Sequence, residues 1–295
     1  MPRLLSGLRE VAPAYDVIFS DVWGVMHNGA TAFAAASDAL SRFRAKGGAA
    51  VLITNSPAPS RIVRAQLDQL GVPAGAYDAI VSSGDVTVSL LMARRGKTLF
   101  HIGAAQETGL FDEVEALTGE RPRFAPIDEA DYVLCTGFID FHRETPQDYD
   151  DRLARVHARG LEFICANPDI VVEVDGVLSY CAGAIAERYE RLGGAVVQAG
   201  KPFAPIYERA LAFAAKALGR TPERARALAI GDAMRTDVAG AIRNGFDSVL
   251  VTSGIHREEL HAGAQEGSAI DAAALRQFVE EAGLRPTAAM AQLSW

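Results

Sequence analysis

The chain has 295 residues, which is enough for a core domain and a second domain. Apolar residues make up 49% and charged residues 22% of the sequence, so a sizeable hydrophobic core can be buried. The formal net charge of −8 argues against nucleic acid or an anionic membrane as a partner, because both need a broad basic surface.

The cysteines and the apolar stretches argue against four further kinds of protein: disulfide-rich, zinc-binding, membrane-spanning and secreted ones. Cys135, Cys165 and Cys181 are odd in number and lack a CxxC pair, so they predict neither a disulfide framework nor a zinc site. No stretch reaches the roughly 18 apolar residues that span a bilayer, and the first residues lack the long apolar region of a signal peptide. These features predict a cytoplasmic protein.

Strand and helix patterns alternate along the chain. In the first third we expect strands at 15–20, 49–53 and 80–81, and helices at 32–45, from a cap at Ser60, and at 86–93. In the middle we expect strands at 99–102, 132–136 and 161–165, and helices at 146–158 and 184–192. Towards the end we expect helices at 205–218, 238–244 and 269–282, and strands at 227–230 and 248–252.

This alternation predicts an α/β fold with a doubly wound, Rossmann-like parallel sheet covered on both faces. The middle region, 97–197, is long enough to bury a core of its own, so we expect it to form an inserted α/β domain. Residues 1–96 and 198–295 would then form the core domain. Ligands of such sheets bind at the carboxyl ends of the strands.

Polar clusters stand where three of the predicted core strands end, and a lysine precedes the third. The residues are Asp21, Thr54, Asn55, Lys201, Asp232 and Asp237. Carboxylates are the hard oxygen ligands that Mg²⁺ prefers, and one carboxylate can instead attack phosphorus to form an aspartyl-phosphate. A lysine, a hydroxyl and an amide can neutralise the charge on the phosphoryl oxygens. The clusters therefore indicate phosphoryl transfer.

These four motifs, in this order, resemble those of the haloacid dehalogenase superfamily of aspartate-nucleophile phosphatases. The resemblance is to its class IIA branch, the NagD-like phosphatases, which carry a large α/β cap between the second and third motifs. It extends over residues 14–254. It implies a Mg²⁺-dependent phosphatase of a small phosphorylated metabolite, a sugar phosphate, a nucleotide or a similar ester. It also allows a homodimer through the cap.

The resemblance also implies a role for each motif residue. Asp21 would attack phosphorus and bind Mg²⁺ together with the Trp23 carbonyl, Asp232 and Asp237. Thr54 and Asn55 would bind the phosphoryl oxygens, and Lys201 would hold the nucleophile and the phosphate. In the cap, Ala166-Asn167-Pro168-Asp169 is similar to the family's Thr-Asn-Pro-Asp loop, which makes Asn167 and Asp169 candidates for substrate contact.

One position departs from the pattern. The family's phosphatases usually carry a second aspartate two residues after the nucleophile, which protonates the leaving group, and this chain has Trp23 there. General acid–base catalysis contributes about 10²–10⁴-fold, so its loss should slow the reaction. His27 could act as acid or base instead, or the substrate could have a good leaving group. The Asp-x-Trp-Gly sequence at residues 21–24 resembles a motif that a subgroup of the same branch carries.

Two other functions stay open. The absence of the usual aspartate at Trp23 favours a catalytically weak protein that binds phosphorylated ligands. A haloacid dehalogenase attacks carbon with the same aspartate and carries an aromatic residue two positions later, followed by glycine, which Asp21-Val22-Trp23-Gly24 resembles. Dehalogenases need no metal, however, and lack the paired aspartates that are present here as Asp232 and Asp237.

Overall fold

The computed structural model describes residues 1–174, 177–261 and 269–295. Contacts divide the chain into two compact units. Unit 1 comprises Met1–Thr54, Arg64–Val81 and Lys201–Trp295, and unit 2 comprises Asn55–Val63 and Ser82–Gly200. The domain boundaries at 97 and 197 stay a prediction. Among the described helices, none combines the length and the apolar character that crossing a membrane requires.

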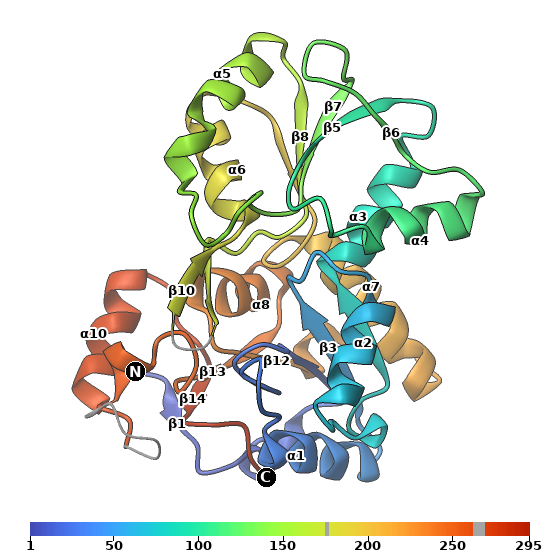
Figure 1. The fold of residues 1–295 in the computed structure, drawn as a ribbon. Helices are drawn as coiled ribbons and strands as arrows, with labels where there is room; N and C mark the ends of the chain where they lie inside the picture. Colours follow the sequence, from blue (N-terminus) through green and yellow to red (C-terminus); the bar gives the residue numbers. More distant parts are fainter. Residues whose placement is uncertain (175–176, 262–268) are drawn as a thin grey trace. The chain divides into compact units, whose positions relative to one another are not determined.

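Unit 1 is built on a seven-stranded sheet in the order β1-β14-β13-β12-β2-β3-β4 (Figure 1). Its strands are β1 (Arg3–Leu4), β2 (Val17–Ser20), β3 (Ala49–Thr54), β4 (Ala79–Ser82), β12 (Ala227–Gly231), β13 (Asp247–Val251) and β14 (Ala288–Met290). Every pairing from β1 to β3 is parallel. The strand order reverses between β2 and β12, which is where such sheets bind ligands. The predicted fold class is confirmed.

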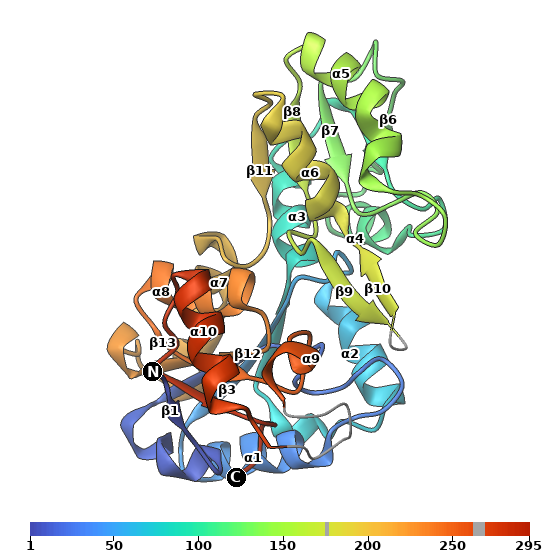
Figure 2. The ribbon, with the colours of Figure 1, turned by 90° about the vertical axis from the view of Figure 1, so that its left-hand side faces the viewer.

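Helices cover this sheet because their apolar faces need burial. They are α1 (Ala34–Ala45), α2 (Ser60–Gln69, shared with unit 2), α7 (Ala204–Leu218), α8 (Ala239–Asn244), α9 (Arg257–Leu260) and α10 (Ala272–Ala282). Both α1 and α7 pack on β3, whose six residues are all buried, as the apolar strand of a two-sided parallel sheet must be. Figure 2 shows α10 beside β13, where Leu275 and Val279 pack against Leu250.

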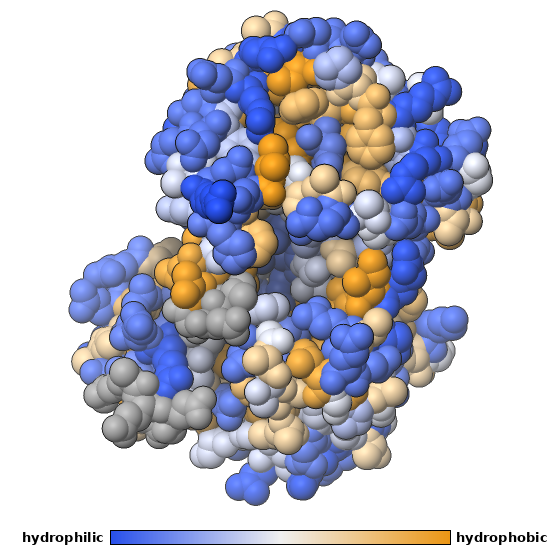
Figure 3. All heavy atoms as spheres, in the orientation of Figure 1, coloured by the Kyte–Doolittle hydropathy of each residue, from blue (hydrophilic) through white to orange (hydrophobic). Residues whose placement is uncertain are grey.

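Unit 2 contains a five-stranded parallel sheet in the order β11-β8-β7-β5-β6 and a two-stranded antiparallel ribbon. The sheet strands are β5 (Thr98–Ile102), β6 (Arg123–Phe124), β7 (Tyr132–Cys135), β8 (Glu162–Cys165) and β11 (Val196–Gln198), and the ribbon pairs β9 (Val171–Val174) with β10 (Val177–Tyr180). The helices are α3 (Ser83–Met92), α4 (Gly109–Thr118), α5 (Asp150–Ala158) and α6 (Ala182–Arg191). On the face that Figure 3 shows, hydrophobic residues lie among hydrophilic ones.

Candidate active site

Asp21 and Asp232 are brought together by the register of β2 and β12. Ser20 lies opposite Ile230, and the backbone N–H of Asp21 donates to the Ile230 carbonyl over 2.8 Å. The two aspartates therefore leave the carboxyl ends of neighbouring strands side by side. Parallel pairing at the switch point of the sheet thus places two carboxylates from distant parts of the sequence in one space.

Asp237 reaches the same space through an unusual turn. Met234–Val238 forms a single π-helical turn between β12 and α8, a wider winding that is frequent at functional sites. The N–H of Ala233 donates to Asp237 Oδ2 over 3.1 Å, which fixes the side chain. Gly231 makes room for it, because a Cβ at that position would lie 2.0 Å from the Asp237 carboxyl carbon.

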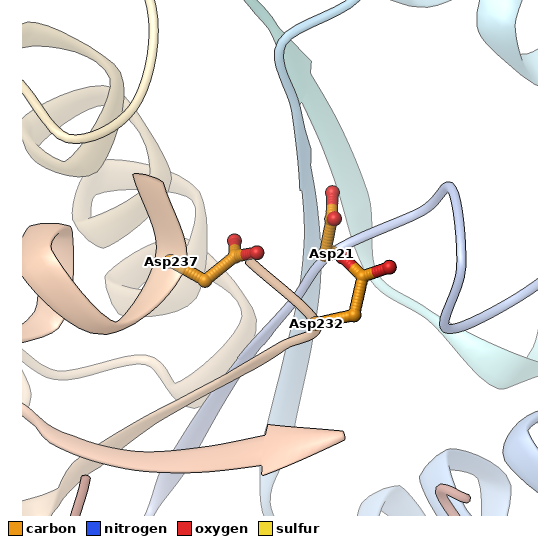
Figure 4. A group of neighbouring side chains, drawn as sticks. All are labelled: Asp21, Asp232 and Asp237. Atoms are coloured by element: carbon orange, nitrogen blue, oxygen red, sulfur yellow. The ribbon is translucent and has the colours of Figure 1, made fainter. Parts of the chain in front are cut away.

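The three carboxyl groups gather at the end of the sheet (Figure 4). One oxygen from each of Asp21, Asp232 and Asp237 lies within 4.8 Å of the others. Their exposed fractions are only 8%, 6% and 4%. Hard, buried oxygen donors at this spacing fit a divalent cation such as Mg²⁺.

Lys201 lies against two of these carboxylates and is itself 3% exposed. Its Nζ donates to Asp21 Oδ1 over 2.6 Å and to Asp237 Oδ1 over 2.7 Å. Burial, and then the Asp237 charge, nevertheless raise the pKa of Asp21 well above its usual range. One ammonium does not balance three buried carboxylates, so the charge of the site also fits a bound cation.

Asp232 is held by the loops around it. Its Oδ2 accepts the N–H of Ile255 over 2.9 Å. Gly24 has a φ of +77° and passes so close that a Cβ would lie 2.1 Å from the same oxygen. A glycine is therefore required both by the left-handed backbone and by the approach to the carboxylate. The sequence shows Gly24 as the glycine of the Asp-x-Trp-Gly pattern, but the contacts of Asp232 with Gly24 and with the Ile255 N–H were not predicted.

The predicted phosphate-binding and substrate-binding residues fall in both units. Thr54 is the buried last residue of β3 in unit 1. In unit 2, Asn55 Nδ2 donates to Asp169 Oδ1 over 2.9 Å, and Asn167 Oδ1 accepts the N–H of Asp169 over 3.1 Å. The structure thus brings Asn55, Asn167 and Asp169 into one hydrogen-bonded group.

Trp23 and His27 stabilise the loop after β2. Their rings lie 5.1 Å apart, edge to face, and His27 Nδ1 accepts the N–H of Gly29 over 2.9 Å. Burial lowers the pKa of His27 to about 4, so the imidazole is neutral at pH 7. Because Nδ1 is an acceptor, the ring proton is on Nε2. A catalytic role for His27 stays a prediction.

Comparisons with known proteins agree with this fold. A haloacid dehalogenase-like hydrolase family model matches residues 18–116, and a HAD-hydrolase-like model matches residues 198–277. None of the curated proteins compared with the chain matches it.

Solved structures extend the likeness over the whole chain. A haloacid dehalogenase-like hydrolase from Brucella suis is 41% identical, with a TM-score of 0.83 over 99% of this chain and 100% of that one. A possible sugar phosphatase from Cytophaga hutchinsonii (18% identity, TM-score 0.75, 98% of both chains) shares the fold. NagD from Escherichia coli (22% identity, TM-score 0.63, 94% of this chain and 96% of that one) does so too. The chain therefore belongs to the haloacid dehalogenase-like hydrolases.

Proposed function

We propose that this hydrolase is a Mg²⁺-dependent phosphatase of small phosphorylated metabolites that works through an aspartyl-phosphate at Asp21. The observation that carries the proposal is the buried group of three carboxylates with Lys201 hydrogen-bonded to two of them. Similar folds described as a possible sugar phosphatase and a glycerol phosphate phosphatase support it.

The metal site would consist of Asp21, Asp232, Asp237 and the Trp23 carbonyl. When bound, Mg²⁺ supplies positive charge that neutralises phosphoryl oxygens. The buried position of the three carboxylates supports this assignment, because burial without a cation is costly for like charges.

Asp21 is oriented for attack by its own hydrogen bonds. Oδ1 accepts the N–H of Val22 over 2.7 Å and the ammonium of Lys201 over 2.6 Å. Oδ2 then bonds to phosphorus while the bond from phosphorus to the leaving oxygen breaks and its electron pair stays on that oxygen. Water releases phosphate from Asp21 in the second step. Thr54 and Asn55 would bind the phosphoryl oxygens, and Asn167 and Asp169 would contact the leaving group.

The indole of Trp23 restricts fast reaction to substrates whose leaving groups need little protonation. An indole has one N–H donor and no titratable proton, so it cannot protonate a leaving alkoxide. We therefore expect the enzyme to favour aryl, acyl or enol phosphates, whose leaving groups need little protonation, over alkyl phosphates.

The test is hydrolysis of 4-nitrophenyl phosphate with Mg²⁺, with acid-quenched enzyme examined by mass spectrometry. Wild type should turn over and show a phosphoryl group on Asp21, whereas Asp21→Asn should show neither. Asp38→Asn, an exposed carboxylate on α1, is the matched control and should behave as wild type. Equal activity of Asp21→Asn and wild type would rule out Asp21 as the nucleophile.

A catalytically weak phospho-ligand-binding protein is the second candidate, because Trp23 replaces the usual acid. It predicts thermal stabilisation by phosphate esters with negligible turnover, and no gain in rate from Trp23→Asp. A sharp gain would instead show that the missing acid limits a phosphatase. Turnover of a 2-haloacid that persists in EDTA would favour a dehalogenase over both.

A homodimer through unit 2 and a cytoplasmic location stay proposals. Three exposed apolar side chains of unit 2 support the dimer: Phe124 is 50% exposed, Phe141 47% and Ile139 42%. Sedimentation equilibrium of wild type and of a Phe124→Ser/Phe141→Ser variant measures it, and a monomeric wild type would contradict it.

A further inference from the structure

Unit 1 contains a pocket that is separate from the three carboxylates. Its volume is about 510 Å³, within the roughly 300–1,000 Å³ of small-molecule sites. It lies at the amino ends of the central strands: Asp16 directly precedes β2, Gly48 precedes β3 and Arg226 precedes β12.

The position of the pocket distinguishes it from the active site. The carboxylates stand at the opposite ends of the same strands, since Asp21 follows β2 and Asp232 follows β12. The five steps along the chain from Asp16 to Asp21 correspond to roughly 16 Å of extended strand. In Figures 1 and 2 the C-terminal residue, which lines the pocket, lies beside α1.

Three aromatic side chains line the pocket: Tyr15, Phe43 and Trp295. The Tyr15 hydroxyl donates to Asp247 over 2.8 Å, which fixes that ring. Gly48 covers the Phe43 ring so closely that a Cβ would lie 2.3 Å from it. The Lys46 ammonium lies 5.3 Å from the centroid of the Trp295 ring, a cation–π contact. Phe43 is thus packed against Gly48 and 3% exposed, whereas the partly exposed Tyr15 and Trp295 rings are the flat walls that suit a planar ring.

The lining is cationic although the whole chain carries a net charge of −8. Among the lining side chains, Arg9, Lys46 and Arg226 are basic and Asp16 is acidic. Asp16 accepts two hydrogen bonds of 2.9 Å from Arg226 and one of 2.7 Å from Arg220, so its charge is already compensated. Within the described ranges, Arg9 and Lys46 have no carboxylate partner. Both are exposed and can receive an anion.

We propose that this pocket binds a small aromatic anion of about the size of a mononucleotide. Its ring would stack on the aromatic walls, and its phosphate or carboxylate would pair with Arg9 and Lys46. Stacking of one ring on an aromatic side chain changes affinity by about five- to a hundredfold. A guanidinium and an ammonium both bind phosphate and carboxylate groups.

The experiment is calorimetric titration of AMP, and separately of 2-naphthoate, into Asp21→Asn protein in EDTA. Without nucleophile or metal no turnover occurs, so a negative result would concern the pocket and leave the proposed phosphatase untouched. The AMP arm tests a phosphate ligand and the 2-naphthoate arm a carboxylate. Saturable binding of at least one probe with a stoichiometry of one supports the pocket if the pocket variants below weaken it, since AMP could otherwise occupy the phosphate site beside residue 21.

Variants then locate the binding. In the same background, Arg9→Ala/Lys46→Ala should weaken it by about tenfold or more, and Trp295→Ala by a similar factor. Arg42→Ala/Lys216→Ala removes two exposed cations outside the pocket and should leave affinity unchanged. Failure of both probes to bind saturably would overturn the proposal. Equal affinity in pocket and control variants, with unchanged unfolding midpoints, would do so as well.

Discussion

Lys201 is a buried cation held between two carboxylates. It is 3% exposed and hydrogen-bonded to both Asp21 and Asp237. Lys201→Met keeps the volume but leaves two adjacent buried carboxylates without a cation. We expect kcat/KM for 4-nitrophenyl phosphate to fall by about 10²–10³. In EDTA, the free energy of unfolding should fall by about 3–5 kcal/mol.

Both quantities are measured directly, by steady-state turnover and by urea unfolding. Lys216→Met, on the exposed end of α7, is the control and should change neither. A Lys201→Met protein as active and as stable as the control would show that the ammonium does not balance the site.

His27 gives a pH dependence whose sign follows from burial. Its pKa is about 4 in the folded chain and 6.5 for an exposed histidine. Between these values the unfolded chain binds the extra proton, so stability is full above about pH 6.5 and falls as the pH drops towards 4. At pH 5 the loss from this residue is about 2 kcal/mol.

His27→Asn should therefore reduce the difference between the unfolding free energies at pH 7 and at pH 5. Urea unfolding at the two pH values measures this difference. The variant also separates a loop role from catalysis. We expect kcat to stay within about tenfold of wild type, whereas a drop of 10²–10⁴-fold would identify His27 as the general acid or base.

Single-residue motifs could be predicted from sequence because each stands at the end of a strand or directly after it. Asp21, Thr54 and Asp232 follow apolar runs whose ends are plain in the sequence. The contact of Lys201 with Asp21, 180 positions apart, was expected only through the family resemblance, and the hydrogen bond from Asn55 to Asp169, 114 positions apart, was not predicted. Such contacts depend on the packing of whole elements.

The proposed metal site depends on the shape of the loop between β2 and α1. Gly24 in this loop has a φ of +77°, and a Cβ there would meet Asp232, whereas Gly71 has a φ of +80° and a Cβ there would meet nothing within 4 Å. Gly24→Ala and Gly71→Ala therefore carry the same backbone cost, but only the first displaces a carboxylate. We expect Gly24→Ala to weaken Mg²⁺ binding by about 10–100-fold, measured by calorimetry.

Gly71→Ala is the matched control and should bind Mg²⁺ with the affinity of wild type. Equal weakening in both variants would mean that general loss of stability, and not the approach to Asp232, explains the result.

Element boundaries show where local signals fail. The helix expected at 86–93 begins earlier, as α3 at Ser83, because Ser82 and Asp85 form a capping box over 3.0 Å in both directions. Ser60 was expected to cap α2, but it is the first helical residue and donates to Asp85 Oδ1. One carboxylate thus serves the starts of two helices, which no sequence spacing reveals. The β9–β10 ribbon was not predicted, although Val-Val-Glu-Val and Val-Leu-Ser-Tyr flank an Asp-Gly pair, which is a strong hairpin signal in a sequence.

At the scale of the whole molecule, metal binding should be visible as stability. A ligand that binds only the folded chain stabilises it by about 2.7 kcal/mol at a hundred times its Kd. For a chain of this size we expect Mg²⁺ to raise the unfolding midpoint by several degrees, and EDTA to reverse the shift. Differential scanning fluorimetry measures it.

Asp232→Asn should abolish the shift, because it removes one of the three buried carboxylates, while Asp38→Asn should preserve it. A Mg²⁺ shift of the same size in Asp232→Asn would place the ion elsewhere.

The pairing of β1 with β14 has a consequence for synthesis on the ribosome. Residues 82–200 of unit 2 emerge as one continuous stretch, so its sheet can form while translation proceeds. The sheet of unit 1, by contrast, joins the earliest strand, Arg3–Leu4, to the latest, Ala288–Met290. The strand β1 therefore cannot pair until residues 288–290 have been made, and β2 lacks its neighbour β12 until residues 227–231 have been made.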